Sequence, residues 1–490
     1  MTKFKIKYPW ACAFCAFAVL GACLYGYDGV YFNGDIFVQH FGTRKSDGTY
    51  KIPPSELSVM TSMINVGEFV GSLSAAPLND YLGRKPVFLI ASAMIVAGVI
   101  LQVTTVSNRD HITGGRAVLG FGVGAFSSTS PLYIAVRAFS RVGNPLTRIR
   151  RWPHRAFEVL SSCAGSSRCM ESNKTPTAYR VPIGFQLVFP GLVFALIYFV
   201  PESPRWLVRQ GKEREAVRSL QAIRRGEHDY DPQGENPVER RKLIYSAGSL
   251  IAQQINGIQW FYYFGPVFAK EIGLSDPFMM TVIAFVIQVV VVFAAVLCAN
   301  KIPRRPLLLT TGILMTISIF IVGCLGIPGN NVSKTNGKVI ISFVILEICS
   351  FNFSYGPLGW TIASEMAVGR NRNKIYAIAV ACFWVTVWAT VFTLPYLYYS
   401  AGLGPKTGFV YTGLCFITLA YVYFCVGEVT GRTMEEINGF FTNGVPAKSG
   451  GTSLLRDRRT ERRNPTAYPS TPSATTRSST NTWTTRSSRT

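Results

Sequence analysis

The sequence predicts an all-helical membrane protein, and three observations lead to this fold class. Hydrophobic residues make up 48% of the 490 residues and charged residues only 15%. The mean hydropathy of +0.24 lies above that of soluble globular chains. Many uncharged stretches can cross a hydrocarbon layer about 30 Å thick as helices that rise about 1.5 Å per residue. Because lipid offers no hydrogen-bond partners, each segment must pair its backbone amides internally, which favours helices over strands.

Eleven apolar segments are candidate membrane-spanning helices, and a polar, basic loop divides them into two groups. They lie near residues 9–33, 57–80, 86–105, 112–135, 181–200, 243–268, 277–299, 307–327, 338–366, 375–399 and 408–427. We expect a cytoplasmic N-terminus (1–8), a first bundle (9–200), a cytoplasmic loop (201–242), a second bundle (243–436) and a disordered, basic, Ser/Thr-rich tail (437–490).

A short basic turn is repeated in the two groups. Gly83-Arg84-Lys85-Pro86 follows the second segment, and Pro303-Arg304-Arg305-Pro306 follows the seventh. Each turn leads directly into the next apolar run. Two related halves joined by a long loop are typical of transporters, in which the substrate site lies between the halves near the middle of the membrane.

The charge pattern excludes other classes of protein. The formal net charge is +23, but Lys and Arg are spread over turns and loops, where they mark the cytoplasmic side, and do not form one nucleic-acid-binding face. We find no nucleotide-binding loop, catalytic triad or metal cluster, so we expect neither an enzyme nor a cofactor. Cys12 and Cys15 form a CxxC without a second pair, and we interpret the eleven cysteines as mostly small buried apolar side chains.

Residues 137–176 do not fit this pattern. The stretch 137–170 contains seven Arg against one acid, Glu158. At about 2.5 to 3.5 kcal/mol per central Arg, it cannot span the membrane unaided. With only four spans before it and one after, the basic loop 201–242 would lie outside, whereas its charge predicts that it lies inside. One helix of the first bundle therefore looks corrupted.

Six motifs follow one another in a fixed order. They are Gly71–Asp80 running into Gly83-Arg84-Lys85, Gly115-Arg116 with Pro131-Leu132-Tyr133, Pro201-Glu202-Ser203-Pro204-Arg205-Trp206-Leu207, Gln253-Gln254-Ile255-Asn256-Gly257, Pro357-Leu358-Gly359-Trp360 through Glu365, and Gly431–Glu436. Over about 1–136 and 177–443 the chain therefore resembles the sugar porter family of the major facilitator superfamily, most closely its fungal hexose transporters. The resemblance implies two six-helix bundles that carry a sugar by alternating access.

The chain also departs from the family. The family motif Pro-x-Tyr-x-x-Glu leads into an apolar fifth helix, but Val136 and Arg137 stand here instead, and the similarity resumes only near Tyr179. A frame-shifted exon or misplaced splice junction explains this better than a genuine insertion. Trp384 and Trp388 dominate the eleventh helix, where the family carries an Asn.

The candidate sugar site contains four amides within seven residues, namely Gln253, Gln254, Asn256 and Gln259. Amides can donate and accept hydrogen bonds with hydroxyls, although amides in membrane helices also bond neighbouring helices. The resemblance assigns Gln253, Gln254 and Gln259 to sugar hydroxyls. Trp360 follows Pro357 and Gly359, which can bend the tenth helix, and by resemblance it covers the sugar. Tyr262 and Tyr263 are weaker candidates, which can equally form an aromatic belt.

Proton coupling and gating are expected from charged residues. Asp28 follows an apolar run and Arg116 is its natural partner; the pair either couples a proton to transport or locks two helices together. By resemblance, Asp80 with Arg84, Glu202 with Arg205, and Glu365 with Arg370 or Arg372 form a cytoplasmic gate, although charges at helix ends are often simply solvated. Asn331-Val332-Ser333 is a candidate glycosylation site, and Asn173 begins a second sequon.

We therefore predict a plasma-membrane transporter of a hexose or related small sugar, working as a sugar:proton symporter in the lipid bilayer, without nucleic acid and with no oligomer implied. Two alternatives remain: a sugar sensor that transports nothing, and a non-functional product of a faulty gene model.

Overall fold

A computed structural model describes residues 37–38, 41–44, 50–105, 108–137, 180, 183–199, 202, 206–207, 210–212, 215, 236–262, 277–298, 302–326, 334–368, 371–428, 437, 439 and 441. The elements are β1 (Thr43–Arg44), β2 (Tyr50–Lys51), α3 (Pro54–Tyr81), α4 (Arg84–Thr104), α5 (Arg109–Arg137), α9 (Val188–Leu196), η1 (Ile197–Phe199), α12 (Asn236–Gln254), α14 (Pro277–Cys298), α15 (Arg304–Leu325), α16 (Lys334–Phe353), α17 (Tyr355–Met366), α18 (Arg372–Pro395), η2 (Tyr396–Ser400), η3 (Gly404–Lys406) and α19 (Thr407–Cys425).

The predicted helical fold class is confirmed in the described residues. The two short strands form one antiparallel pair, and the remaining elements are helices. Five helical stretches are long and apolar enough to cross a membrane: 84–104, 304–325, 336–366, 372–400 and 404–425. The predicted first span (9–33), most of 137–176 and nearly all of the tail lie outside the described residues.

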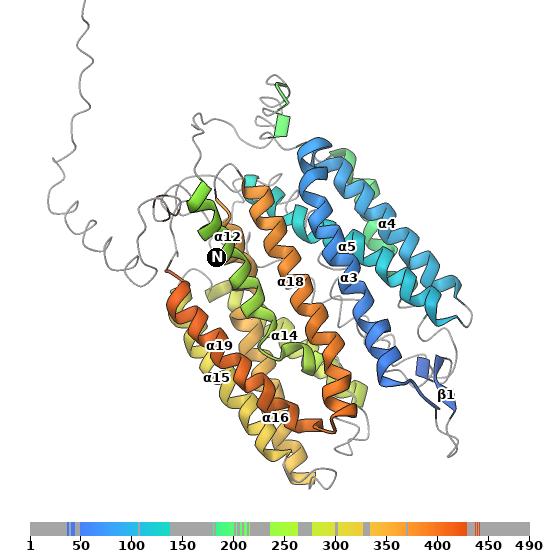
Figure 1. The fold of residues 1–490 in the computed structure, drawn as a ribbon, viewed down its shortest axis with the longest axis vertical. Helices are drawn as coiled ribbons and strands as arrows, with labels where there is room; N and C mark the ends of the chain where they lie inside the picture. Colours follow the sequence, from blue (N-terminus) through green and yellow to red (C-terminus); the bar gives the residue numbers. More distant parts are fainter. Residues whose placement is uncertain are drawn as a thin grey trace, which may run out of the picture.

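The helices gather in two groups with α18 between them. Figure 1 shows α3, α4 and α5 side by side on one flank, and α12, α14, α15, α16 and α19 on the other. Buried apolar side chains follow the same division, since one cluster draws only on residues between 37 and 197 and another only on residues between 258 and 437.

Glycines bring α3 and α5 into backbone contact. Gly67 and Gly71 lie one turn apart on α3, and Gly120 and Gly124 lie one turn apart on α5. A Cβ on any of the four would collide with a backbone oxygen of the facing helix. Each pair is a GxxxG sequence, which lets two membrane helices approach closely.

Side-chain hydrogen bonds hold α12 along α17. Ser246, Ser249 and Gln253 lie on one face of α12 and donate to the backbone oxygens of Ala363, Gly359 and Gly356, at 2.8, 3.0 and 2.7 Å. Hydroxyls and amides at this helical spacing act as interhelical contacts in lipid.

Two membrane segments are interrupted. The helix α12 ends at Gln254, and Gly257 then adopts a left-handed backbone (φ +88°) that a residue with a Cβ rarely takes. The segment 334–366 is broken between α16 and α17 at Ser354. The second break follows from Pro357, because proline has no N–H to donate to the carbonyl of Phe353, four residues earlier.

The two halves of the chain meet along α18. Trp384 donates its indole N–H to the hydroxyl of Ser127 on α5, at 3.1 Å. Phe69 of α3 packs against a buried cluster that otherwise consists of residues from 243 onward. The contact between α3 and α18 therefore closes one side of the interface between the halves.

Candidate functional site

The predicted amide cluster lies at the break after α12. The side chain of Asn256 accepts a hydrogen bond from the backbone N–H of Ile258 at 3.3 Å. The helical hydrogen bonding resumes after the break, where the backbone N–H of Trp260 donates to the oxygen of Gly257 at 3.0 Å. In membrane transporters, interrupted helices expose polar groups to a substrate at mid-membrane. The four amides therefore lie at or next to a break in a membrane segment.

The four amides are buried but not fully satisfied. Gln259 donates to the oxygen of Gln254 at 2.6 Å, and Gln253 donates to Gly356 of α17. The Oε1 of Gln253 and the Nδ2 of Asn256 have no hydrogen-bond partner among the described residues. Gln253 is thus both an interhelical contact and a remaining acceptor, because its two functions use different atoms.

A second cluster of polar side chains connects three segments through hydrogen bonds. The sequence indicated it only in part, through Tyr262. The hydroxyl of Tyr262 donates to Gln288 of α14 at 3.3 Å and accepts from Asn352 of α16 at 3.1 Å. The Nε2 of Gln288 and the Oδ1 of Asn352 have no partner among the described residues. Gln288 could have been noticed as a lone amide in an apolar run, and Asn352 by its place two residues before the break.

The aromatic candidate Trp360 lies on α17. Its ring centroid is 4.8 Å from that of Phe383 on α18. The same helix supplies the carbonyl of Gly356 that binds Gln253. One short helix therefore carries the tryptophan and contacts the amide cluster. Phe383, which was not predicted, adds an aromatic face next to it.

Only one member of the predicted proton pair lies in the described residues. Arg116 is fully buried in α5, and its Nη2 lies 3.4 Å from the backbone oxygen of Thr61 on α3. Asp28 lies outside the described residues, as do Arg205, Arg370 and Asn331.

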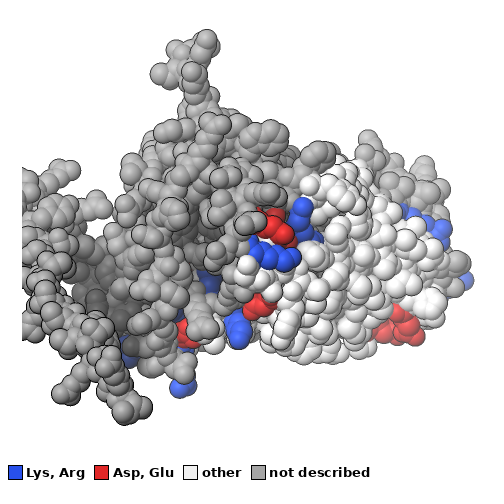
Figure 2. Space-filling model, turned by 90° about the horizontal axis from the view of Figure 1, so that it is seen from above, with Lys and Arg blue, Asp and Glu red and all other residues white. Residues whose placement is uncertain are grey.

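Charged groups gather at the end of the molecule where α3 ends and α4, α15 and α18 begin, which we call the turn end. Figure 2 views this end and shows acidic and basic side chains next to each other there. Asn373 of α18 donates to Asp80 of α3 at 3.0 Å and so joins the two halves. Arg84, predicted with Asp80, donates from its guanidinium to the backbone oxygen of Asn79 at 3.3 Å.

Two glutamates cap corresponding helices in the two halves. Glu202 accepts from the backbone N–H groups of Arg84 and Lys85 at 2.9 and 3.0 Å, in the first turn of α4. Glu428 accepts from the backbone N–H of Arg305 at 3.1 Å, in the first turn of α15. A carboxylate in this position satisfies otherwise unpaired amides and the positive end of the helix dipole.

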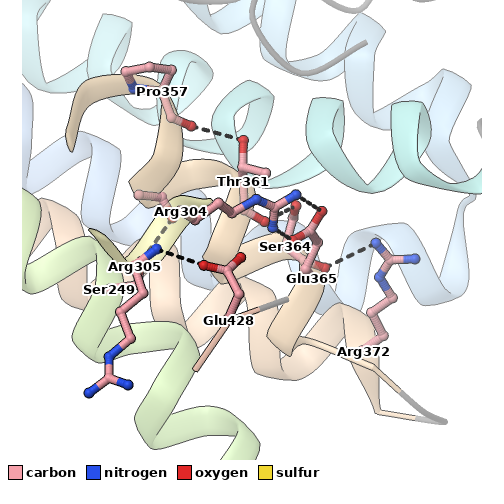
Figure 3. A network of polar contacts seen from close by, with 10 residues as sticks. Ser249, Arg304, Arg305, Pro357, Thr361, Ser364, Glu365, Arg372 and Glu428 are labelled. Carbon is pink, nitrogen blue, oxygen red and sulfur yellow. Dashed lines mark hydrogen bonds and ion pairs between the residues drawn. The ribbon is translucent and has the colours of Figure 1, made fainter. Parts of the chain in front are cut away.

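A buried ion pair lies beside the second cap. Arg304 binds both carboxylate oxygens of Glu365, one of them at 3.1 Å, and both side chains are almost fully buried. Figure 3 shows this pair together with Arg372, which donates to the backbone oxygen of Ser364 at 3.3 Å. The sequence predicted Arg370 or Arg372 beside Glu365 and gave no indication that Arg304 is its partner.

Comparison with known proteins identifies the family. The family model "Sugar (and other) transporter" matches residues 14–441. The chain belongs to this sugar transporter family. It is therefore an integral, multi-pass membrane transporter and not an enzyme.

Relatives of the chain include fungal proteins. The chain is 26% identical to the high glucose sensor RGT2 of Saccharomyces cerevisiae, covering 87% of this chain but only 60% of the sensor. It is 27% identical to the low-affinity glucose transporter HXT4 of S. cerevisiae, covering 89% of this chain and 81% of that protein. A probable glucose transporter of Neurospora crassa, rco-3, is 28% identical over 87% of this chain and 78% of its own length.

Solved structures show the same fold. The proton:xylose symporter XylE of the major facilitator superfamily superposes with a TM-score of 0.72 at 21% identity, over 88% of this chain and 99% of that one. A partially occluded, inward-open structure of XylE from E. coli gives a TM-score of 0.68 at 20% identity, over 86% and 99% of the two chains. The predicted major facilitator fold is confirmed.

Proposed function

We propose that this family member carries a hexose or related small sugar across the plasma membrane by alternating access, together with a proton. The observation that supports it best is the group of unpartnered polar atoms at the two broken segments. Gln253 and Asn256 contribute one each at the first break, and Asn352 contributes one next to the second. Buried polar atoms without partners carry a free-energy cost that a ligand rich in hydroxyls would remove.

Each site residue has a role that follows from its chemistry. Gln253, Gln254, Asn256 and Gln259 bind sugar hydroxyls, because an amide donates and accepts at once. Trp360 covers one face of the sugar ring. The names of the relatives agree with this substrate class, since glucose transporters are among them.

The proposed proton coupling uses Asp28 and Arg116. A carboxylate in an apolar site takes up a proton readily, and a nearby guanidinium opposes this, so forming and breaking the pair would link proton binding to the conformation. XylE, a proton:xylose symporter, shares the fold. An alkaline shift of a weakly buffered medium on sugar addition would distinguish symport from facilitated diffusion, which leaves the pH unchanged.

The proposed gate lies at the turn end. Asp80, Arg84, Glu202, Arg205, Glu365 and Arg370 would hold the halves together there while the site faces outward. The hydrogen bond from Asn373 to Asp80 supports this proposal, because it crosses between the halves.

Uptake of labelled D-glucose and D-xylose into yeast cells that lack their own hexose transporters tests the function. We expect saturable uptake by the full chain. Uptake should fall about tenfold or more in Gln259→Ala, because a sugar hydroxyl then enters the site without its hydrogen-bond partner. Asn108→Ala is the control, because this exposed residue contacts the first turn of α5 and is not a member of the proposed site. Equal uptake by the two variants contradicts the assigned site, and no uptake by the parent chain contradicts transport.

The relative RGT2 supports one second candidate, a glucose sensor. A sensor would alter expression of a glucose-responsive reporter gene while it carries no labelled sugar. The same yeast cells with such a reporter distinguish the two functions.

A further inference from the structure

A buried carboxylic acid lies in α16, outside the amide group of the proposed sugar site. Glu347 is 0% exposed, and neither carboxylate oxygen has a hydrogen-bond partner among the described residues. An ionised carboxylate in such surroundings has a large desolvation cost with nothing to offset it. Ionisable groups inside membrane helices are costly, and those that occur are usually functional.

We propose that Glu347 is a proton-binding site of this transporter, and that proton binding there favours sugar binding. The inference rests on the proposed transport function and adds to it a titratable group in the second half of the chain.

The contacts of Cys415 connect Glu347 to the sugar site. The Cys415 thiol of α19 lies close enough to Glu347 for an electrostatic interaction. The same thiol donates to the backbone oxygen of Asn256 at 3.5 Å. Asn256 lies in the break that carries the hydrogen-bonded pair Gln254 and Gln259. Cys415 therefore contacts the break at Asn256 and also lies near Glu347.

The neighbouring helices offer Glu347 no compensating charge among the described residues. Its electrostatic neighbours are two thiols, Cys349 on its own helix and Cys415 on α19. The helix α15 contributes Thr316, which is hydrogen-bonded to Cys415. Its arginines 304 and 305 lie about twelve residues before Thr316, or about 18 Å along the helix axis. The helix α14 presents the uncharged amide of Gln288. From α17, the phenol of Tyr355 also interacts with Cys415, and Glu365 is bound to Arg304.

The break at Ser354 gives α16 a place to bend. It lies two turns beyond Glu347, and the Ser354 hydroxyl lies 2.5 Å from that of Thr311 on α15. A change of angle there moves Glu347 relative to α15 and α19. Its proton affinity then differs between conformations, and this difference is the thermodynamic requirement for coupling proton to sugar.

Sugar binding to the purified full-length protein, measured by tryptophan fluorescence with D-glucose from pH 5.5 to pH 8.5, tests the proposal. We expect the affinity of the parent protein to fall on the order of tenfold as the pH rises, since the buried site then holds a charge. Glu347→Gln mimics the protonated side chain and should show a smaller pH dependence than the parent, since Asp28 alone still titrates. Glu56→Gln is the matched control, because Glu56 is 41% exposed and pairs with Arg109, and it should keep the parental pH dependence.

Three outcomes overturn the proposal: pH-independent binding by the parent, parental pH dependence in Glu347→Gln, and loss of the pH dependence in the control. Infrared spectroscopy adds a readout that needs no sugar, since the carbonyl band of a buried protonated carboxylic acid should weaken in Glu347→Gln. If the parent binds no sugar at any pH, the transport function fails and the linkage fails with it. In that case the infrared band still reports the proton site.

Discussion

The side-chain amide of Asn373 donates a hydrogen bond to the carboxylate of Asp80 across 3.0 Å, and 293 residues separate the two in the chain. The bond joins the first turn of α18 to the end of α3. It therefore fastens the two halves together at the turn end, on the line where α3 and α18 already pack.

Asn373→Ala should shift the protein towards the state that is open at the turn end. The lost hydrogen bond is worth about 1 kcal/mol, which corresponds to about a fivefold change in the ratio of states. Distances between spin labels on Tyr81→Cys and Lys374→Cys, in a background without other reactive cysteines, measure this ratio. An unchanged distance distribution would contradict the role of this bond, and Asn108→Ala should leave the distribution as it is.

Glu365→Gln should destabilise the fold more than the same substitution at a more exposed glutamate does. It leaves the buried guanidinium of Arg304 without its counter-charge, at a cost of about 3 to 5 kcal/mol. Thermal unfolding of the protein in detergent should show a lower midpoint than Glu56→Gln. Replacing both partners with Arg304→Met and Glu365→Leu should recover most of the loss, because the guanidinium that lost its partner is also removed. A double variant as unstable as the single one would contradict this explanation.

Glu202→Ala should open the first turn of α4. Its carboxylate accepts two backbone N–H groups, and losing such a cap costs about 1 kcal/mol. Amide hydrogen exchange at Lys85 should accelerate several-fold, while exchange at Arg305 stays constant. Glu428→Ala should have the reciprocal effect. If either variant accelerates exchange at Lys85 and Arg305 equally, the two glutamates do not act on separate helices.

Gly120→Ala should weaken the contact between α3 and α5. The new Cβ meets the backbone oxygen of Ile64, which cannot move aside as a side chain can, and overpacking costs about 1 to 3 kcal/mol. Gly114→Ala on the same helix has open space around it and is the matched control. Thermal unfolding should separate the two, and equal midpoints would show that α3 can shift to accept the methyl group.

Five of the spans could be predicted, because run length and hydropathy are local properties. The bend in the segment 338–366 was also predictable, since Pro357 removes a backbone donor, and the break lies at Ser354. The amide cluster was found because four polar residues in a membrane helix are unusual.

Other site features depend on which helices become neighbours, and no local pattern specifies that. Arg304 and Glu365 are 61 residues apart, and arginines 370 and 372 were closer in sequence to the acid. Tyr262, Gln288 and Asn352 come from three separate segments, and no feature of the sequence indicates that the three side chains meet.

The glycine contact between α3 and α5 and the Glu202 cap on α4 use residues only from the first 202 positions. During synthesis this part emerges before the rest of the chain exists, and domains made first can fold first. These helices can therefore associate in the membrane before α18 is translated, and the late arrival of α18 against α3 becomes the step that unites the molecule.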